Sequence, residues 1–179
     1  MVVKKFMKIL KTKFKDLVVI KKDTFKDSRG YFKELFAQKL FKKKFVFDVM
    51  SFSKKNVIRG LHLQLNKQQG KYITILQGKV LDVALDLRKR SKTFGKVFKI
   101  VLSSENNTSV YIPPGFAHGF CSLSNNSLMH YKCTNYRDKS SETGIIWNDN
   151  DLKIKWPTNN PIISKKDQKL NNYKDFKKK

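Results

Sequence analysis

Apolar residues recur along this chain in short runs that alternate with polar residues, which is the period of a β-strand. Residues 80–87, VLDVALDL, are the clearest case, because four apolar residues on one face alternate with a second face that carries two aspartates. Turn residues such as Gln77-Gly78-Lys79 and Pro113-Pro114-Gly115 separate the runs. The predicted strands are 6–10, 17–20, a hairpin within 25–36, 45–53, 57–64, 71–76, 80–87, 97–102, 109–112, 116–122, 128–134 and 144–147.

This pattern predicts an all-β protein, with about ten short strands spaced near ten residues apart in an antiparallel sandwich or barrel. A helical period is absent except near the C-terminus. The 179 residues suit one domain, 1–179, and 40% hydrophobic residues are enough for a core. We expect residues 1–6 and 168–179 to be flexible basic ends, although the Lys-rich and Asn-rich tail from Lys165 also has the alternative of lying over the body.

The formal net charge of +25 raises the question of nucleic-acid binding. Only five of the 39 basic residues are arginine, the residue that base readers and phosphate clamps favour, and the lysines are spread along the whole chain. We therefore expect no nucleic-acid partner, and a lysine-rich surface that attracts negatively charged small substrates.

The two cysteines, Cys121 and Cys133, fall in predicted strands without metal or redox spacing, which indicates buried free thiols in a reducing compartment. No apolar run approaches the roughly 18 residues that span a bilayer, and lysines interrupt the N-terminal apolar residues too often for a signal peptide. These features predict a cytoplasmic protein without a membrane partner.

Candidate chemistry centres on residues 57–71 and 111–120, which contain His62 and His118 after glycine-containing segments. Metal binding is the first hypothesis for histidines in a β-barrel, but Gln64 is a poor ligand and no glutamate follows four or five residues after His62. We therefore expect no metal. In strand 128–134, Tyr131 facing the interior places His130 outside.

Metal-free acid and base chemistry suits these side chains better. A neutral histidine oriented by a carboxylate removes a proton, a buried lysine stabilises an oxyanion, and a tyrosine returns a proton. Together such groups abstract a proton next to a carbonyl. For any one residue alone, the alternative is a polar side chain with a purely structural hydrogen bond.

Eight motifs carry a resemblance to a known family: DSRGYFKE, VIRGLHLQ, QGK, GKVLDVALDLRKRSKTFG, YIPPGFAHGF, YKCTNY, WNDNDLKIKWP and ISKKD. In order and spacing, from about Met7 to Asp167, the chain resembles the dTDP-4-dehydrorhamnose 3,5-epimerases. The resemblance implies a cupin-like jelly roll with short peripheral helices, no cofactor, and a homodimer with exchanged strands. The implied substrate is a nucleotide-linked 4-keto-6-deoxyhexose on the route to activated L-rhamnose and related surface sugars.

The resemblance also implies roles for particular residues. His62 resembles the general base, Asp167 its partner, Lys71 the group that steadies the enolate, and Tyr131 the acid on the opposite face. Arg59 and His118 resemble contacts to the sugar and diphosphate, with Ser51 and Gln64 beside them. Three further residues resemble nucleotide contacts made from a partner subunit: Arg29, Phe32 and Glu34. Tyr136 resembles an aromatic that stacks on the base.

The chain departs from the family pattern at four positions. Phe47 and Val49 stand where polar residues are typical, Leu63 stands where an aromatic is common, and Arg137 follows Tyr136 where a second aromatic is usual. The acid and base residues are intact, so the prediction is inversion at C3 and C5 of a dTDP-linked sugar. The alternatives are a mono-epimerase, an epimerase of GDP- or CDP-linked sugars, and a non-catalytic cupin that binds sugar or nucleic acid. From the residues alone, Arg29 and Glu34 also have the alternative of a surface ion pair.

Overall fold

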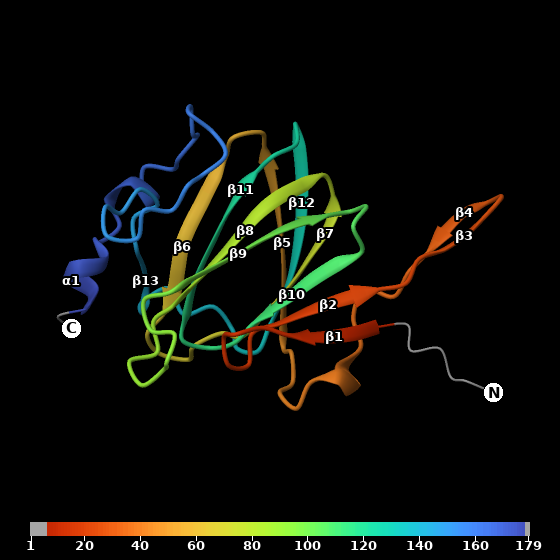
Figure 1. The fold of residues 1–179 in the computed structure, drawn as a ribbon, viewed down its shortest axis with the longest axis horizontal. Helices are drawn as coiled ribbons and strands as arrows, with labels where there is room; N and C mark the ends of the chain where they lie inside the picture. The colour runs from red at the N-terminus through yellow and green to blue at the C-terminus, as the bar shows by residue number, and fades with distance from the viewer. Residues whose placement is uncertain (1–6, 178–179) are drawn as a thin grey trace.

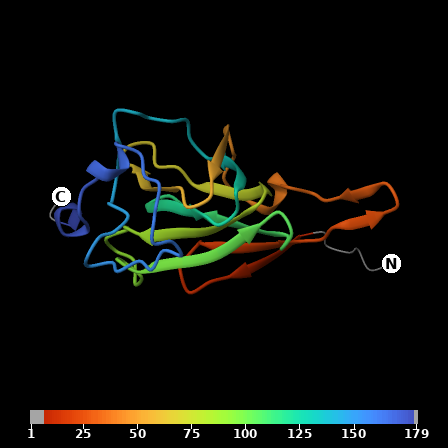
Figure 2. The same ribbon diagram turned by 90° about the horizontal axis from the view of Figure 1, so that it is seen from above.

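The computed structural model describes residues 7–177, and these fold into two antiparallel β-sheets that pack face to face (Figures 1 and 2). The six-stranded sheet has the order β1 (Met7–Lys11), β2 (Val18–Lys22), β10 (Thr108–Ile112), β7 (Lys71–Gln77), β12 (Asn126–Cys133) and β5 (Phe47–Lys54). The five-stranded sheet has the order β13 (Glu142–Gly144), β6 (Ile58–Gln64), β11 (Phe116–Ser122), β8 (Lys79–Asp86) and β9 (Val97–Ser103).

A separate hairpin, β3 (Phe25–Asp27) and β4 (Gly30–Phe32), extends away from the two sheets at one end of the molecule (Figure 1). The described helices are short: η1 (Gln38–Leu40), η2 (Asp167–Lys169) and α1 (Tyr173–Lys177). The predicted all-β jelly roll with short peripheral helices is therefore confirmed, including the helical turn near the C-terminus.

Strand boundaries are the main correction to the sequence analysis. The last strand is Glu142–Gly144 rather than 144–147, because Ile145 makes only an isolated bridge to Asn171. Within 25–36 only two three-residue strands form, and the segment after Phe32 leaves the hairpin to run towards η1. The residues described contain thirteen strands, which is more than about ten but equals the number of predicted ranges when the hairpin counts as two strands.

The alternation along β8 explains how the sheets pack. Val80 and Ala84 point between the two sheets and join the central core with Phe14, Leu102 and Met129. The opposite face of β8, with Val83 and Leu85, forms a second core under the C-terminal segment, which contributes Trp156 and Tyr173. Both faces of this strand are buried, so its two aspartates lie in the interior.

The C-terminal segment is packed against the body as far as the structure describes it. The Tyr173 side chain is 7% exposed, and its backbone N–H donates to Asp149 Oδ2 at 2.8 Å. Residues 1–6, and residues 178–179 of the tail, lie outside the described part of the chain. No helix among residues 7–177 is long and apolar enough to cross a bilayer. Cys121 and Cys133 are both free and buried, as predicted.

Candidate active site

A hollow of about 300 Å³ opens between the two sheets, and both sheets contribute to its walls. The five-stranded sheet supplies residues from β6, β11 and β13, and the six-stranded sheet supplies residues from β5, β7 and β12. The lining residues are Phe47, Val49, Ser51, Arg59, His62, Leu63, Gln64, Gln69, Lys71, His118, Gly119, Phe120, Tyr131, Cys133, Arg137 and Glu142. Seven predicted site residues therefore share one pocket: Ser51, Arg59, His62, Gln64, Lys71, His118 and Tyr131.

Asp167 orients His62 from behind the pocket wall. His62 Nε2 lies 2.8 Å from Asp167 Oδ1, and the other carboxylate oxygen accepts the backbone N–H of Gly60 at 3.0 Å. Gly60 has φ +107, and a Cβ there would collide with the backbone of His118 and Gly119, so only glycine fits. Burial alone would raise the pKa of Asp167, but the hydrogen bonds from His62 and Gly60 hold it below its ordinary value. A charged carboxylate therefore faces the imidazole.

Tyr131 lies on β12, in the sheet opposite His62. Its hydroxyl is 3.0 Å from Ser51 Oγ on the neighbouring strand β5. Burial raises the pKa of the Tyr131 phenol well above 10, and the negative charge of Asp82 adds to this effect. The phenol is therefore protonated at neutral pH and is suited to donate a proton. Tyr131 lines the pocket, and His130, which alternation then places on the opposite face, is not among the lining residues and lies 3.7 Å from Asp48.

Lys71 opens β7 and lines the same pocket. Burial lowers the pKa of its ammonium group below the usual 10.5, and the nearby acidic groups Cys133, Glu142 and Asp82 oppose the shift. A partly desolvated cation of this kind interacts strongly with negative charge that develops on a substrate oxygen.

A second histidine–aspartate pair lies deeper in the site. His118 Nε2 is 2.8 Å from Asp82 Oδ2, and the two side chains are 4% and 0% exposed. Asp82 Oδ1 is buried and has no hydrogen-bond partner among the described residues. The sequence analysis did not select Asp82 as a site residue. The available signal was that Asp82 shares its strand face with the apolar residues Val80 and Ala84 and that the other face is wholly apolar. A carboxylate in such a strand is expected to be buried and to need a partner.

Charged side chains also define the pocket rim. Glu142 Oε2 accepts hydrogen bonds from Arg137 Nε at 3.0 Å and Nη2 at 2.8 Å, while Oε1 accepts one from Lys166 at 2.7 Å. Arg59 is a residue of β6, and its Nη2 donates to the carbonyl of Phe52 on β5 at 2.9 Å. These cations give the rim a positive potential that attracts anions.

Four predicted contacts do not line the pocket of their own chain: Arg29, Phe32, Glu34 and Tyr136. Arg29 lies in the projecting hairpin and pairs with Asp27 at 2.6 Å, so the alternative of an Arg29–Glu34 ion pair is wrong. Asp27 and Arg29 belong to the same tight turn, in which the Asp27 carboxylate accepts hydrogen bonds from both the backbone and the side chain of Arg29. This proximity explains why Arg29 pairs with Asp27 and not with Glu34. Tyr136 is 65% exposed and contacts Phe47, and it is Arg137 that lines the pocket.

The described residues include no group of three or more His, Cys, Asp or Glu side chains arranged to hold a metal ion. The arrangement instead offers the oriented imidazole of His62 on one sheet and the protonated phenol of Tyr131 on the other. Lys71, on β7, lines the same pocket. A molecule held between the sheets would meet a base on one face and an acid on the other.

Comparison with known proteins identifies the family. The family model described as dTDP-4-dehydrorhamnose 3,5-epimerase matches residues 11–175. The dTDP-4-dehydrorhamnose 3,5-epimerase of Shigella flexneri is 45% identical over 168 residues, which are 90% of this chain and 93% of that protein.

Solved structures agree with this match. The crystal structure of dTDP-4-dehydrorhamnose 3,5-epimerase from Elizabethkingia anophelis has a TM-score of 0.88 and 43% identity, over 96% of this chain and 98% of that one. The enzyme from Legionella pneumophila, solved in complex with dTDP-4-keto-L-rhamnose, has a TM-score of 0.89 and 40% identity, over 93% and 92% of the two chains. The chain therefore belongs to the dTDP-4-dehydrorhamnose 3,5-epimerase family.

Proposed function

We propose that this protein inverts C3 and C5 of a dTDP-linked 4-keto-6-deoxyhexose, converting dTDP-4-dehydro-6-deoxy-D-glucose to dTDP-4-dehydro-L-rhamnose. The observation that carries the proposal is the position of the His62–Asp167 pair on one wall of a pocket and Tyr131 on the opposite wall. Inversion needs a proton to leave one face of the ring and return to the other. A protein that only binds a sugar has no need of both groups.

The reaction begins when neutral His62 removes the proton from the carbon next to the C4 ketone. The C–H electron pair forms the enolate double bond, and the negative charge moves to the C4 oxygen, where Lys71 stabilises it. Asp167 stabilises the imidazolium that results. Tyr131 then delivers its phenolic proton to the opposite face of the carbon, and exchange with solvent restores both groups. C3 and C5 both neighbour the ketone, so one base and one acid serve both centres if the ring shifts between steps.

The remaining lining residues bind the rest of the substrate. Arg59 and His118 contact the sugar and diphosphate, and Ser51 and Gln64 add hydrogen bonds beside Tyr131 and His62 respectively. Gln64 is held by the Lys67 carbonyl and the Asp138 N–H, which fix its side chain at the pocket edge. No cofactor or metal enters these steps.

Phe47 and Val49 favour a second candidate, an epimerase that inverts one centre only. Both residues line the pocket on β5, on the same wall as Tyr131. An apolar wall at this point offers the sugar fewer hydrogen bonds, which restricts the orientations that the ring adopts.

We also propose that two copies of the chain form a homodimer in which the hairpin of one copy reaches the pocket of the other. The hairpin extends away from its own body, and its Tyr31 and Phe32 side chains are 63% and 66% exposed (Figure 2). Arg29 and Phe32 then contact the nucleotide in the partner's pocket together with Glu34. The buried free thiols Cys121 and Cys133 support action in the reducing cytoplasm.

Mixing two inactive variants tests the exchange. A hairpin variant, Arg29→Ala with Phe32→Ala, keeps an intact pocket, and a His62→Ala variant keeps an intact hairpin. If the hairpin acts in the partner's pocket, mixed dimers contain one working site and activity returns. If the hairpin serves its own chain, or the chain is a monomer, the mixture stays inactive.

The reaction itself is tested by NMR of dTDP-4-keto-6-deoxyglucose incubated with the protein in D2O in the presence of chelator. Deuterium at both C3 and C5 is the expected result. Label at C3 alone indicates the mono-epimerase. Absence of label in this substrate and in GDP- and CDP-linked 4-keto sugars contradicts the proposed reaction.

A further inference from the structure

A second hollow, of about 470 Å³, lies between two loops and shares no lining residue with the candidate active site. One loop joins β1 to β2 and contributes Lys13, Lys15 and Asp16, and the other joins β8 to β9. The second loop contributes Arg88, Arg90, Ser91, Lys92 and Thr93. We refer to these eight residues as the basic hollow.

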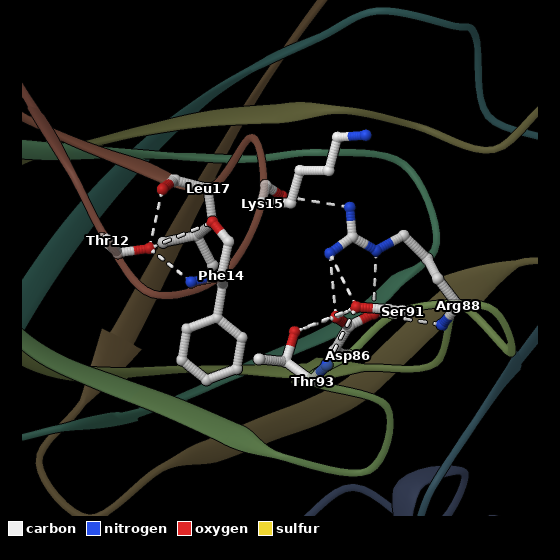
Figure 3. A network of polar contacts seen from close by, with 8 residues as sticks. All are labelled: Thr12, Phe14, Lys15, Leu17, Asp86, Arg88, Ser91 and Thr93. Atoms are coloured by element: carbon white, nitrogen blue, oxygen red, sulfur yellow. Dashed lines mark hydrogen bonds and ion pairs between the residues drawn. The ribbon is translucent and has the colours of Figure 1, made fainter.

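Arg88 forms a fixed cation at the basic hollow (Figure 3). Its Nε and Nη2 donate to the two oxygens of Asp86 at 2.9 and 2.8 Å, and Nη1 donates to the Lys15 carbonyl at 3.0 Å. The guanidinium carbon also lies 4.6 Å from the centre of the Phe116 ring. This set of contacts ties the two loops together and leaves one N–H of Nη1 without a partner among the described residues.

Asp86 is fully buried below Arg88 and is satisfied by further donors. The hydroxyls of Ser91 and Thr93 each donate to its Oδ2 at 2.6 Å. These contacts commit the carboxylate and both hydroxyls to the protein. A ligand in the basic hollow therefore meets mainly N–H donors.

The other four cations of the basic hollow are exposed: Lys13, Lys15, Arg90 and Lys92. None of them forms an ion pair or donates a side-chain hydrogen bond to another residue within 7–177. Like charges that line one hollow repel one another, and the repulsion is relieved when an anion lies among them. Five cationic side chains surround the hollow, whereas Asp16 and the buried Asp86 are the carboxylates beside it, so a net positive charge remains.

We propose that the basic hollow is a binding site for an oligophosphate, a di- or triphosphate chain. Cations from two loops around a hollow of this size contact several phosphate groups at once, and a bound chain of three or more negative charges neutralises them. The lining includes no aromatic residue on which bases would stack, since Phe14 and Phe116 are 1% and 4% exposed, and this favours a phosphate chain over single-stranded nucleic acid.

The test is calorimetric titration of the whole chain with inorganic triphosphate at about 150 mM salt, where weak surface attraction is screened. Saturating dTMP, which carries a single phosphate and so is no oligophosphate, occupies the candidate active site during the titration, and the same titration is repeated with an Arg59→Ala variant without dTMP. We expect one remaining site with a Kd below about 1 mM in both arrangements. Absence of binding in both overturns the proposal, whatever the outcome for the epimerase reaction.

A variant and a charge-matched control distinguish this site from general surface charge. Lys13→Ala, Lys15→Ala and Lys92→Ala together should weaken triphosphate binding at least about tenfold. Lys54→Ala, Lys55→Ala and Lys155→Ala remove the same charge from exposed positions elsewhere and should leave the affinity within about twofold. Equal losses in the two triple variants overturn the proposal, and so does a single-stranded oligonucleotide that binds the hollow more tightly than triphosphate.

Discussion

His62 Nε2 and Asp167 Oδ1 lie 2.8 Å apart although 105 residues separate them in the chain. The carboxylate comes from η2, outside both sheets, and reaches the back of β6 beside Gly60, where no side chain fits. This contact fixes which imidazole nitrogen faces the pocket. The protein therefore presents an oriented base at a position where a substrate C–H bond can lie.

His62→Ala should reduce proton exchange at both C3 and C5 by at least about 100-fold, because a positioned general base contributes on that scale. The measurement is deuterium incorporation by NMR. Exchange at either carbon near the wild-type rate would assign the base to another residue.

Tyr131→Phe should retain more exchange at C3 than completed inversion at C5, since it removes the acid and leaves the base intact. Because burial raises the pKa of Tyr131 well above 10, the wild-type acid stays protonated as the pH rises. The alkaline limb of the rate profile should therefore not be set by this group below pH 10. Unchanged inversion at both carbons in the variant would show that another group returns the proton.

Asp167→Asn keeps the shape of the side chain but should lower the turnover rate by at least about 100-fold, because an amide no longer stabilises the imidazolium. The variant is compared with wild type by rate and by thermal unfolding. A folded variant with wild-type turnover removes Asp167 from the reaction.

Asp82→Asn should weaken substrate binding, because it disturbs the 2.8 Å contact that orients His118. We expect KM to rise roughly tenfold, as for loss of a hydrogen bond to a charged group. The matched comparison is His118→Asn and the double variant. If Asp82 acts through His118, the double variant is no worse than the worse single one, whereas additive losses indicate an independent role.

Asp86 predicts an acid-sensitive contribution to stability. Burial opposes ionisation, but hydrogen bonds from Arg88, Ser91 and Thr93 lower the pKa of Asp86 from 3.8 to about 2. A carboxyl whose pKa is lowered by folding stabilises the fold at any pH above its pKa in the unfolded chain. This stabilisation is lost as the pH falls from about 4 towards 2. A shift of this size corresponds to about 2 kcal/mol. Urea unfolding of wild type and Asp86→Asn should show this difference at pH 7 and a smaller one near pH 3, and parallel pH profiles would contradict it.

Local pattern was enough for the position of most strands, and the motifs that resemble the family supplied most of the pocket residues. Alternation placed Tyr131 and His130 on opposite faces of their strand, because successive side chains of a strand face opposite sides. The same period put the core residues of β8 on two faces, and the turn at Pro113-Pro114-Gly115 separated β10 from β11 as predicted. These features depend on neighbours in the chain, and so the sequence by itself determined them.

Only the tertiary structure decided which distant residues meet. Asp82 joins His118 because β8 and β11 are paired with Asp82 opposite Phe120, a register that no local pattern specifies. The same holds for Lys15, whose carbonyl meets Arg88 where two loops from different sheets come together. Such contacts depend on sheet order and register, which are properties of the whole packed chain.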